Sequence, residues 1–256
     1  MLNPAPIDTS AIAIGYGGLR QNMLADGEFD KALVGDGIEV WVTQMGAYMN
    51  MNTAFIDREN EIVVIVDPFD SVRWTDALAQ EGLNPTHLLY THTHRDHVAG
   101  YSSMIELNPD VEVWGHEDAR VPDLINHVVF ENVDFDRTWK NAPNTSVEWE
   151  AGSISLMVTH SPGHAPGHVT IHGHGVYHAG DLLFTNGMGR VDLPGSSPRD
   201  QWSSIRHAKN ILKSLPEDWR LIPGHRYDWI DGTTPDWVRI GDALSYNYAL
   251  NDPSLG

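Results

Sequence analysis

The chain has 256 residues, of which 41% are hydrophobic and 9% aromatic, so it has enough apolar material for a sizeable core and is not a mainly disordered protein. Sixteen basic against 35 acidic side chains give a formal net charge of −19, which argues against nucleic acids and anionic membranes as partners. No apolar run is long enough to span a bilayer, and the first residues have no signal-peptide pattern. We therefore expect a soluble, cytoplasmic protein.

Cysteine is absent from the sequence, whereas histidine occurs 14 times. The absence of cysteine excludes disulfide bonds, cysteine nucleophiles and zinc sites built from thiolates. Any transition-metal site in this chain must therefore use imidazole and carboxylate ligands.

Residues 1–35 are Gly-rich and irregular, so the first predicted elements come after them. Apolar and β-branched runs then alternate with turn residues. The run at 61–69 is continuously rich in Val and Ile, as in a strand that is buried on both faces. One helix is expected over 71–81. The strands expected in this half cover residues 38–44, 51–57, 61–69, 87–92 and 111–117.

The second half begins with a long connection, residues 118–145, for which a helix and a lid both remain open. Ser197 and Pro198 form a helix-start signal, and apolar residues on one face continue that helix. Another helix is expected near 237–250. The strands expected here cover residues 146–151, 153–160, 168–181 and 220–225. Strand meanders with helices between and after them predict one mixed α/β domain over residues 1–256.

The strongest functional signal is the run T-H-T-H-R-D-H at residues 91–97, directly after a predicted strand. Alternate residues on an extended segment point the same way, so His92 and His94 can bind one cation together. The turn that follows directs Asp96 and His97 toward a neighbouring position, where a second cation fits. A solvated His-rich loop is the alternative, but this ordered pattern seldom arises by chance.

Three more candidate ligands lie where predicted strands end. His164 belongs to the loop S-P-G-H-A-P-G-H, which two prolines stiffen. Asp181 ends an apolar strand, and His225 directly follows another. A carboxylate such as that of Asp181 can give one oxygen to each of two metal ions, which a neutral imidazole cannot do.

The candidate ligands and one further acid occur in the order that is typical of the metallo-β-lactamase superfamily: Asp67, the run 92–97, His164, Asp181 and His225. The sequence resembles that superfamily over about residues 38–228. The resemblance implies an αββα sandwich. In this fold two mixed β-sheets face each other, helices cover the outside, and metal ions lie at the edge where the strand-end loops meet.

By this resemblance, a first metal site holds His92, His94, His164 and Asp181, and a second holds Asp96, His97, His225 and the shared Asp181. Asp96 and Asp181 are then the catalytic carboxylates. Asp67 and His168 are expected to support the ligands through hydrogen bonds rather than to bind metal themselves. The implied cofactor is two divalent cations, with zinc preferred and iron or manganese as alternatives.

Within the superfamily, the sequence is most similar to the glyoxalase II and persulfide dioxygenase branch. Residues 161–170, 180–195 and 223–227 resemble its signatures. True β-lactamases of the superfamily usually have Cys or Ser at the position of Asp181, and quorum-quenching lactonases have Tyr at the position of Phe184. Lactone and β-lactam hydrolysis are therefore less favoured.

Two departures from this branch leave the substrate open. Only residues 226–256 follow His225, where typical glyoxalase II enzymes have a helical domain that binds glutathione. The motif at 189–193 reads G-R-V-D-L, whereas G-R-T-D-F is common in the dioxygenases. Two reaction classes therefore remain open.

The leading hypothesis is a hydrolase in which two metal ions share a bridging hydroxide that attacks a thioester such as a hydroxyacylglutathione. The alternative is a mononuclear iron persulfide dioxygenase, which needs only two histidines and one carboxylate, here His92, His164 and Asp181.

The expected partner is a small-molecule substrate such as a glutathione conjugate, and self-association of the chain stays open. Arg95, Arg190 or Arg226 is expected to guide such an anion toward the metal ions. Arg190 either anchors a substrate carboxylate or braces its Gly-rich turn. Tyr227 either reaches the substrate or packs in the core.

Overall fold

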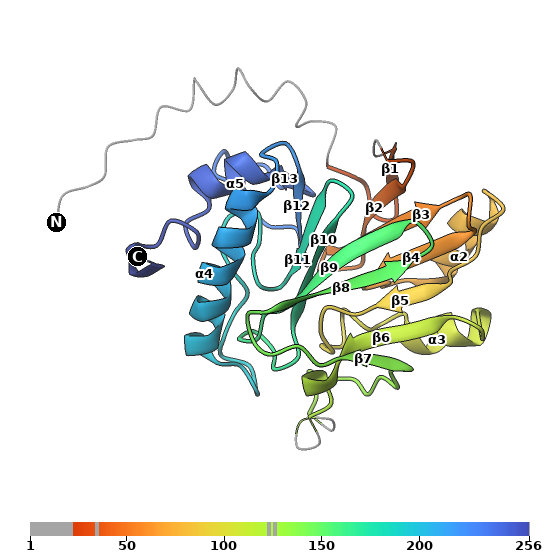
Figure 1. Cartoon of the computed structure of the whole chain (residues 1–256), viewed down its shortest axis with the longest axis horizontal. Helices are drawn as coiled ribbons and strands as arrows, with labels where there is room; N and C mark the ends of the chain where they lie inside the picture. The colour runs from red at the N-terminus through yellow and green to blue at the C-terminus, as the bar shows by residue number, and fades with distance from the viewer. Residues whose placement is uncertain (1–22, 34–35, 122–123, 125–126, 256) are drawn as a thin grey trace.

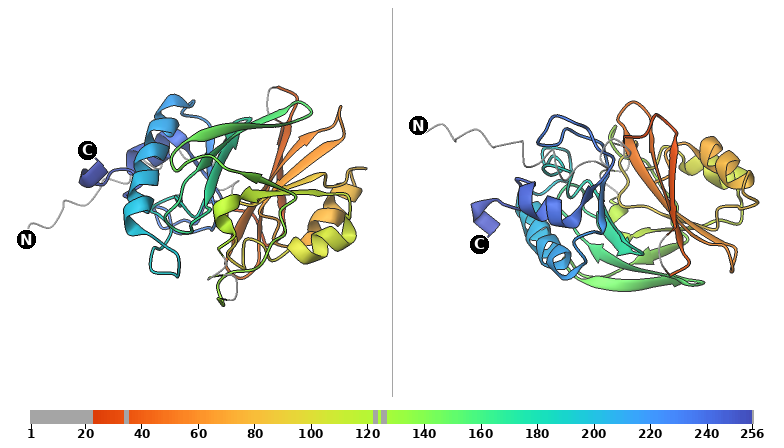
Figure 2. Two further views of the ribbon diagram at one scale, coloured as in Figure 1. Left: turned by 60° about the horizontal axis from the view of Figure 1, so that its bottom comes forward. Right: turned by 90° about the horizontal axis from the view of Figure 1, so that it is seen from above.

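The computed structural model describes residues 23–33, 36–121, 124 and 127–255. In this part of the chain, two mixed β-sheets lie face to face, and helices cover the outer face of each sheet (Figures 1 and 2). This is the αββα arrangement that the sequence predicts. None of the described helices is long and apolar enough to cross a membrane.

The first sheet has the spatial order β1-β2-β3-β4-β5-β6-β7. Its strands are β1 Phe29–Leu33, β2 Glu39–Met45, β3 Asn50–Asp57, β4 Ile62–Val66, β5 His87–Leu89, β6 Glu112–His116 and β7 Arg137–Trp139. Strands β1 to β4 pair antiparallel, whereas β4 to β7 pair parallel. The carboxyl ends of β4, β5 and β6 therefore meet at one edge of the sheet.

The second sheet has the spatial order β13-β12-β11-β10-β9-β8. Its strands are β8 Ser146–Ala151, β9 Ile154–His160, β10 Val169–Gly173, β11 Val176–Gly180, β12 Arg220–Pro223 and β13 Val238–Arg239. All neighbours pair antiparallel except β11 and β12, which are parallel. The carboxyl ends of these two strands again lie side by side.

Four α-helices and two short 3-10 turns complete the described chain. They are α2 Ser71–Ala79, α3 Tyr101–Leu107, η2 Glu117–Ala119, α4 Pro198–Ser214, α5 Ile240–Tyr246 and η3 Pro253–Leu255. As predicted, Ser197 caps α4, since its side chain accepts a hydrogen bond from the Asp200 N–H. In the same way Asp70 caps α2 by accepting from the Arg73 N–H.

Three apolar layers hold the sandwich together. In β2, Trp41 packs in the layer under α2 and α3, whereas Val40 and Val42 pack in the layer between the sheets. Successive side chains of a strand point to opposite faces, so a strand between two apolar layers is buried on both. The third layer joins the second sheet to α4 and α5, with Tyr177 and Leu221 among its members.

The structure corrects several sequence-based boundaries. Residues 29–33, expected to be irregular, form the edge strand β1, because its backbone pairs with β2 although its sequence FDKAL has no clean alternation. Strand β5 ends at Leu89, before His92, and the strand predicted at 168–181 is the hairpin of β10 and β11. The connection 118–145 contains β7 and part of η2, and its residues 122, 123, 125 and 126 lie outside the described residues.

A buried carboxylate ties the two sheets together at the edge opposite these strand ends. Asp57 ends β3, and its Oδ2 accepts the Ser153 N–H from the β8–β9 turn at 2.7 Å and the Asn60 side-chain N–H at 2.6 Å. Its Oδ1 accepts the Asn60 backbone N–H at 3.1 Å. Burial raises the pKa of Asp57, but these hydrogen bonds outweigh it and lower the pKa to about 2.

We predict that Asp57→Asn lowers the free energy of unfolding by about 1–2 kcal/mol at pH 7, because charged hydrogen bonds between the sheets are lost. The folded-state pKa lies below the ordinary value of 3.8, so the carboxylate stabilises the fold above that value and loses this effect as the pH falls toward about 2. Denaturant unfolding across this pH range measures the free energy of unfolding of the variant and of the wild type. The difference between these two free energies should become smaller as the pH falls. A difference that does not change with pH would contradict this role of Asp57.

Candidate metal centre

The strand-end loops of both sheets meet at one edge of the sandwich and bring the seven predicted ligands together. The first sheet contributes the loop after β5, and the second contributes the loops after β9, β11 and β12. The ligands that converge there are His92, His94, Asp96, His97, His164, Asp181 and His225. Residues up to 133 positions apart in the sequence thus share one small site.

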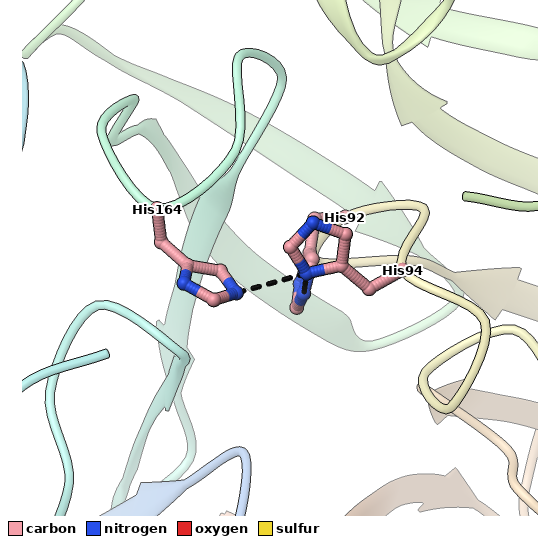
Figure 3. Close-up of side chains that lie close together, drawn as sticks. All are labelled: His92, His94 and His164. Carbon is pink, nitrogen blue, oxygen red and sulfur yellow. Dashed lines mark hydrogen bonds between the residues drawn. The ribbon is translucent and has the colours of Figure 1, made fainter. Parts of the chain in front are cut away.

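His92, His94 and His164, called here the three-histidine set, point their ring nitrogens at one another (Figure 3). Nε2 of His92 lies 3.1 Å from Nδ1 of His94, and Nε2 of His164 lies 2.9 Å from that same atom. All three side chains are buried. Nitrogens on a tetrahedral metal ion lie about 3.3 Å apart, which is close to this spacing.

In two of these rings, the hydrogen bond of the nitrogen that faces away from the site determines which nitrogen carries the proton. Nδ1 of His92 donates to the Thr91 hydroxyl at 2.9 Å, because that hydroxyl gives its own hydrogen to Asp67 at 2.5 Å. Nδ1 of His164 donates to the Arg190 carbonyl at 2.7 Å. A neutral imidazole has one N–H, so Nε2 of each ring carries a lone pair directed into the site.

A second set, Asp96, His97 and His225, lies beside the first. Nε2 of His97 and Nε2 of His225 are 3.2 Å apart, and Asp96 Oδ2 is 3.1 Å from the latter. The opposite nitrogens again have acceptors. Nδ1 of His97 donates to Asp67 at 2.8 Å, and Nδ1 of His225 donates to the Tyr48 carbonyl at 2.9 Å.

Asp181 lies between the two sets. Its Oδ2 is 3.3 Å from Nε2 of His164 in the first set and 3.5 Å from Nε2 of His225 in the second. Its Oδ1 is 3.3 Å from Nε2 of His97, is buried, and accepts no hydrogen bond. A buried carboxylate oxygen without a donor needs a cation beside it, either the protonated His97 or a metal ion that replaces its proton.

The two sets differ in charge. Burial, together with the neighbouring imidazoles, lowers the pKa of His94 to about 3, and burial lowers the pKa values of His92 and His164 as well. In the second set burial also lowers the pKa of each histidine, but the carboxylates outweigh it. They raise the pKa of His97 to about 10 and that of His225 to about 11. A metal ion entering the second set therefore displaces protons.

These residues fit divalent cations. Lone-pair nitrogens that face each other at about 3 Å repel unless a proton or a metal ion lies between them. Imidazole and carboxylate ligands suit zinc, iron or manganese, as the composition predicts.

A further histidine cluster shows the contrast. His116, Asp118 and His160 also lie close together. However, both ring nitrogens of His160 contact carbonyl oxygens, those of Asn141 at 3.1 Å and Pro166 at 2.9 Å. Nδ1 of His116 accepts the Asp118 N–H. The His160 ring braces the loop that carries His164, and the protein already occupies the nitrogens that a metal ion would need.

The predicted supporting residues Asp67 and His168 lie directly behind the ligands. Asp67 receives hydrogen bonds from Thr91 and His97, so it contacts the second set directly and the first set through Thr91. Nε2 of His168 accepts the backbone N–H of Asp181 at 3.0 Å and helps to hold that residue in place. Both residues are buried.

Besides the Thr91 hydroxyl and the Arg190 carbonyl, sequence reasoning missed the Asn50 side chain and the Tyr48 carbonyl as supporting groups. The Asn50 side chain donates to Asp96 Oδ2 at 3.1 Å and to the Asp96 carbonyl at 3.3 Å. The Tyr48 carbonyl orients His225. Asn50 begins a strand across the sheet from the histidine motif and forms an isolated bridge with His225, and no local pattern signals either contact.

The ligands open into a cleft of about 970 Å³. Several large side chains on its walls are solvent-exposed, and Tyr227 is half exposed next to Phe184, with ring centroids 4.6 Å apart. Tyr227 is therefore not a core residue. The residues that line the cleft include Tyr48, Val128, Phe184, Met188, Arg190, Tyr227 and Tyr248.

The arginines of the cleft differ in their freedom. Arg190 forms a two-bond ion pair with Asp192, and both side chains are exposed. Arg226, by contrast, donates to the buried Asp236 at 3.0 Å and to Gln44 at 3.1 Å. Arg226 also lines the cleft, but its guanidinium is engaged inside the protein, so its role in guiding a substrate stays a prediction.

The family model of the metallo-beta-lactamase superfamily matches residues 50–225, which include all seven predicted ligands. The chain belongs to this superfamily. Two curated relatives carry the name hydroxyacylglutathione hydrolase. The protein of Tolumonas auensis is 28% identical over 70% of this chain, and that of Aeromonas salmonicida is 31% identical over 69%. The matched regions span 62% and 61% of these relatives, less than two thirds of their length.

Solved structures share the fold. BLEG-1 B3 metallo-beta-lactamase superposes with a TM-score of 0.67 at 24% identity, over 82% of this chain and 99% of the other. TTHA1623 in a di-iron-bound form gives a TM-score of 0.60 at 26% identity, over 80% of this chain and 97% of the other. The resemblance and the αββα fold expected from the sequence are confirmed.

We predict that Thr91→Val weakens metal binding by about 10- to 100-fold, because Nδ1 of His92 loses its acceptor and Asp67 loses a donor. Competition with a chelator measures this affinity.

Thr93→Val in the same motif is the matched control. The Thr93 hydroxyl makes a long contact of 3.4 Å to the Ala119 carbonyl and none to a predicted ligand. Equal metal affinity in the two variants would refute the orienting role of Thr91.

Proposed function

We propose that the protein is a dinuclear metal hydrolase that cleaves acyl thioesters, with hydroxyacylglutathiones as the substrate class. One observation carries this proposal. Two sets of inward-facing nitrogens and carboxylate oxygens share Asp181 at the base of an open cleft. The names of the curated relatives support the thioester, although the chain matches only part of their length.

The three-histidine set and Asp181 would hold one divalent cation, and Asp96, His97, His225 and the same Asp181 would hold the other. We propose zinc, with iron or manganese as alternatives. When bound, such cations lower the pKa of a water molecule to about 7 and polarise a substrate carbonyl.

The chain's own residues provide orientation and proton transfer. Asp181 lies close to both sets and would connect them, while Asn50 orients the carboxylate of Asp96. The Asp96 side chain is 27% exposed against 8% for Asp181, and it lines the cleft. Asp96 is therefore the carboxylate placed to accept the proton that water loses when it attacks a thioester carbonyl.

The walls of the cleft suit the two ends of a thioester. Phe184 and Met188 provide an apolar surface near Asp181 for the acyl and sulfur atoms. The ion pair of Arg190 and Asp192 is exposed, so breaking it costs little free energy. Arg190 can therefore leave Asp192 and bind a substrate carboxylate. Tyr227 contributes an exposed ring for the remainder of the thiol.

The mononuclear persulfide dioxygenase is the second candidate, since His92, His164 and Asp181 alone would satisfy it. The second set favours the hydrolase. Asp67 and the Tyr48 carbonyl orient His97 and His225, and Asn50 orients Asp96. A reaction at one metal ion does not require these three supporting contacts.

We predict that S-lactoylglutathione is hydrolysed with a kcat/KM about tenfold or more above that for penicillins and acyl-homoserine lactones. The reason is that Phe184 has no hydroxyl to assist a lactone, whereas the cleft offers apolar surface and Arg190 to a glutathione thioester. Parallel assays with metal-replete protein measure kcat/KM for each of the three substrate classes. Efficient lactone or β-lactam hydrolysis with negligible thioesterase activity would overturn the proposal.

We predict that His225→Ala reduces thioester hydrolysis by about 100-fold or more, because the second set loses an oriented ligand. Metal analysis of the purified variant should show one cation fewer per chain. His207→Ala on α4, away from the cleft lining, is the control and should match the wild type.

The same variant separates the two candidate chemistries. A persulfide dioxygenase would keep its iron and most of its oxygen consumption after His225→Ala and would lose both after His164→Ala. Full thioesterase activity of the His225→Ala protein would rule out the dinuclear mechanism.

A further inference from the structure

The loop after Asp181 folds back on itself and forms one wall of the cleft; residues 181–190 are called here the cleft hairpin. The Phe184 N–H donates to the Gly187 carbonyl at 3.0 Å, and the Gly189 N–H donates to the Asp181 carbonyl at 3.1 Å. Alternate residues then line the cleft: Phe184, Asn186, Met188 and Arg190. The position of the hairpin therefore sets the shape of the cleft beside Asp181.

Asn247, which ends α5, holds the tip of this hairpin. Its side-chain Nδ2 lies 2.8 Å from the Phe184 carbonyl, 3.2 Å from that of Gly187 and 3.3 Å from that of Thr185. Asn247 is fully buried and does not line the cleft. It thus contacts the hairpin backbone without being available to a substrate.

The other end of the same amide is fixed as well. Its Oδ1 accepts the backbone N–H groups of Ala249 at 2.8 Å and Leu250 at 3.3 Å. The asparagine side chain has an NH2 group that donates and an oxygen that accepts, and Asn247 uses the NH2 group and the oxygen here. An aspartate would turn a carboxylate oxygen toward three carbonyls. An alanine would remove the side-chain partner of the Phe184 and Thr185 carbonyls and of the Ala249 and Leu250 N–H groups in the interior.

The hairpin is also connected to the predicted ligands. The Arg190 carbonyl accepts the Nδ1–H of His164, and the Asp181 carbonyl accepts the Gly189 N–H. On the C-terminal side, the Tyr248 N–H contacts Asn186 Oδ1 at 3.4 Å, and the Tyr248 ring packs over Gly187. One buried amide therefore links the C-terminal segment to a wall that begins at Asp181.

We infer that Asn247 is a positioning residue of the active site, which fixes the cleft hairpin and with it the substrate-binding wall formed by Phe184, Asn186 and Met188. It lies outside the stretch 50–225 that matches the superfamily. The C-terminal segment, residues 247–251, is thus a functional part of the cleft. The effect on kinetics rests on the proposed thioesterase function, whereas the effect on the hairpin backbone does not.

Asn247→Ala tests this inference. Asn247 holds the backbone at residues 184–187, which include no predicted metal ligand. KM for S-lactoylglutathione should therefore rise about tenfold while kcat and metal content change much less. Hydrogen exchange of peptides covering 182–190 should be about tenfold faster than in the wild type. Asn247→Ser, which keeps one short donor, should give intermediate values, and it decides the question if the alanine variant does not fold.

Asn251→Ala is the matched control. The exposed Asn251 lies in the same segment and donates to the carbonyls of Leu244 and Asn247, but it does not contact the hairpin. It should keep wild-type KM and wild-type exchange in 182–190. If the Asn247 variants are folded and match the Asn251 control in both measurements, the inference is wrong. If the wild type does not hydrolyse S-lactoylglutathione, the proposed function fails, and the exchange experiment alone decides the role of Asn247.

Discussion

The buried carboxylate of Asp67 is the group on which both sets of predicted ligands depend for their orientation. Its Oδ1 accepts the Thr91 N–H at 2.8 Å, and its Oδ2 accepts the Thr91 hydroxyl and Nδ1 of His97. Through Thr91 it orients His92 in the first set, and directly it orients His97 in the second. Asp67 has a φ of +49°, which is uncommon outside glycine and tolerated by aspartate. Burial raises its pKa, but the imidazoles of His178 and His97 outweigh it and lower the pKa to about 2, so the acceptor stays ionised.

The sequence predicts which candidate ligands lie together, because the signal for each of them is local. The motif at 91–97 and the residues His164, Asp181 and His225 each follow a strand, and strand ends that share an edge bring them together. The strands themselves are predictable for the same reason, since a Val- and Ile-rich run buried on both faces carries its own signature. Edge strand β1 has no such signature, because pairing with β2 rather than side-chain burial specifies it.

Apart from Asp67 and His168, the supporting groups could not be predicted, because their contacts are long-range or use the backbone. The carbonyls of Tyr48 and Arg190 orient His225 and His164, and a carbonyl carries no residue identity that a pattern could reveal. Asn50 and Asn247 act through side chains, yet each lies far along the chain from its partner. An isolated asparagine is ordinarily a turn or surface residue, so its burial had to be seen in the structure.

A metal ion bound at the candidate centre would also cross-link the two halves of the sandwich. Its predicted ligands come partly from the loop after β5 in the first sheet and partly from loops of the second, so a bound cation would join layers that otherwise adhere mainly through apolar contact. A cation that binds only the folded chain stabilises it by about 2.7 kcal/mol for each site at a free concentration 100 times its dissociation constant. Metal supply would then influence how long the folded protein persists in a cell, independently of how fast it turns over substrate.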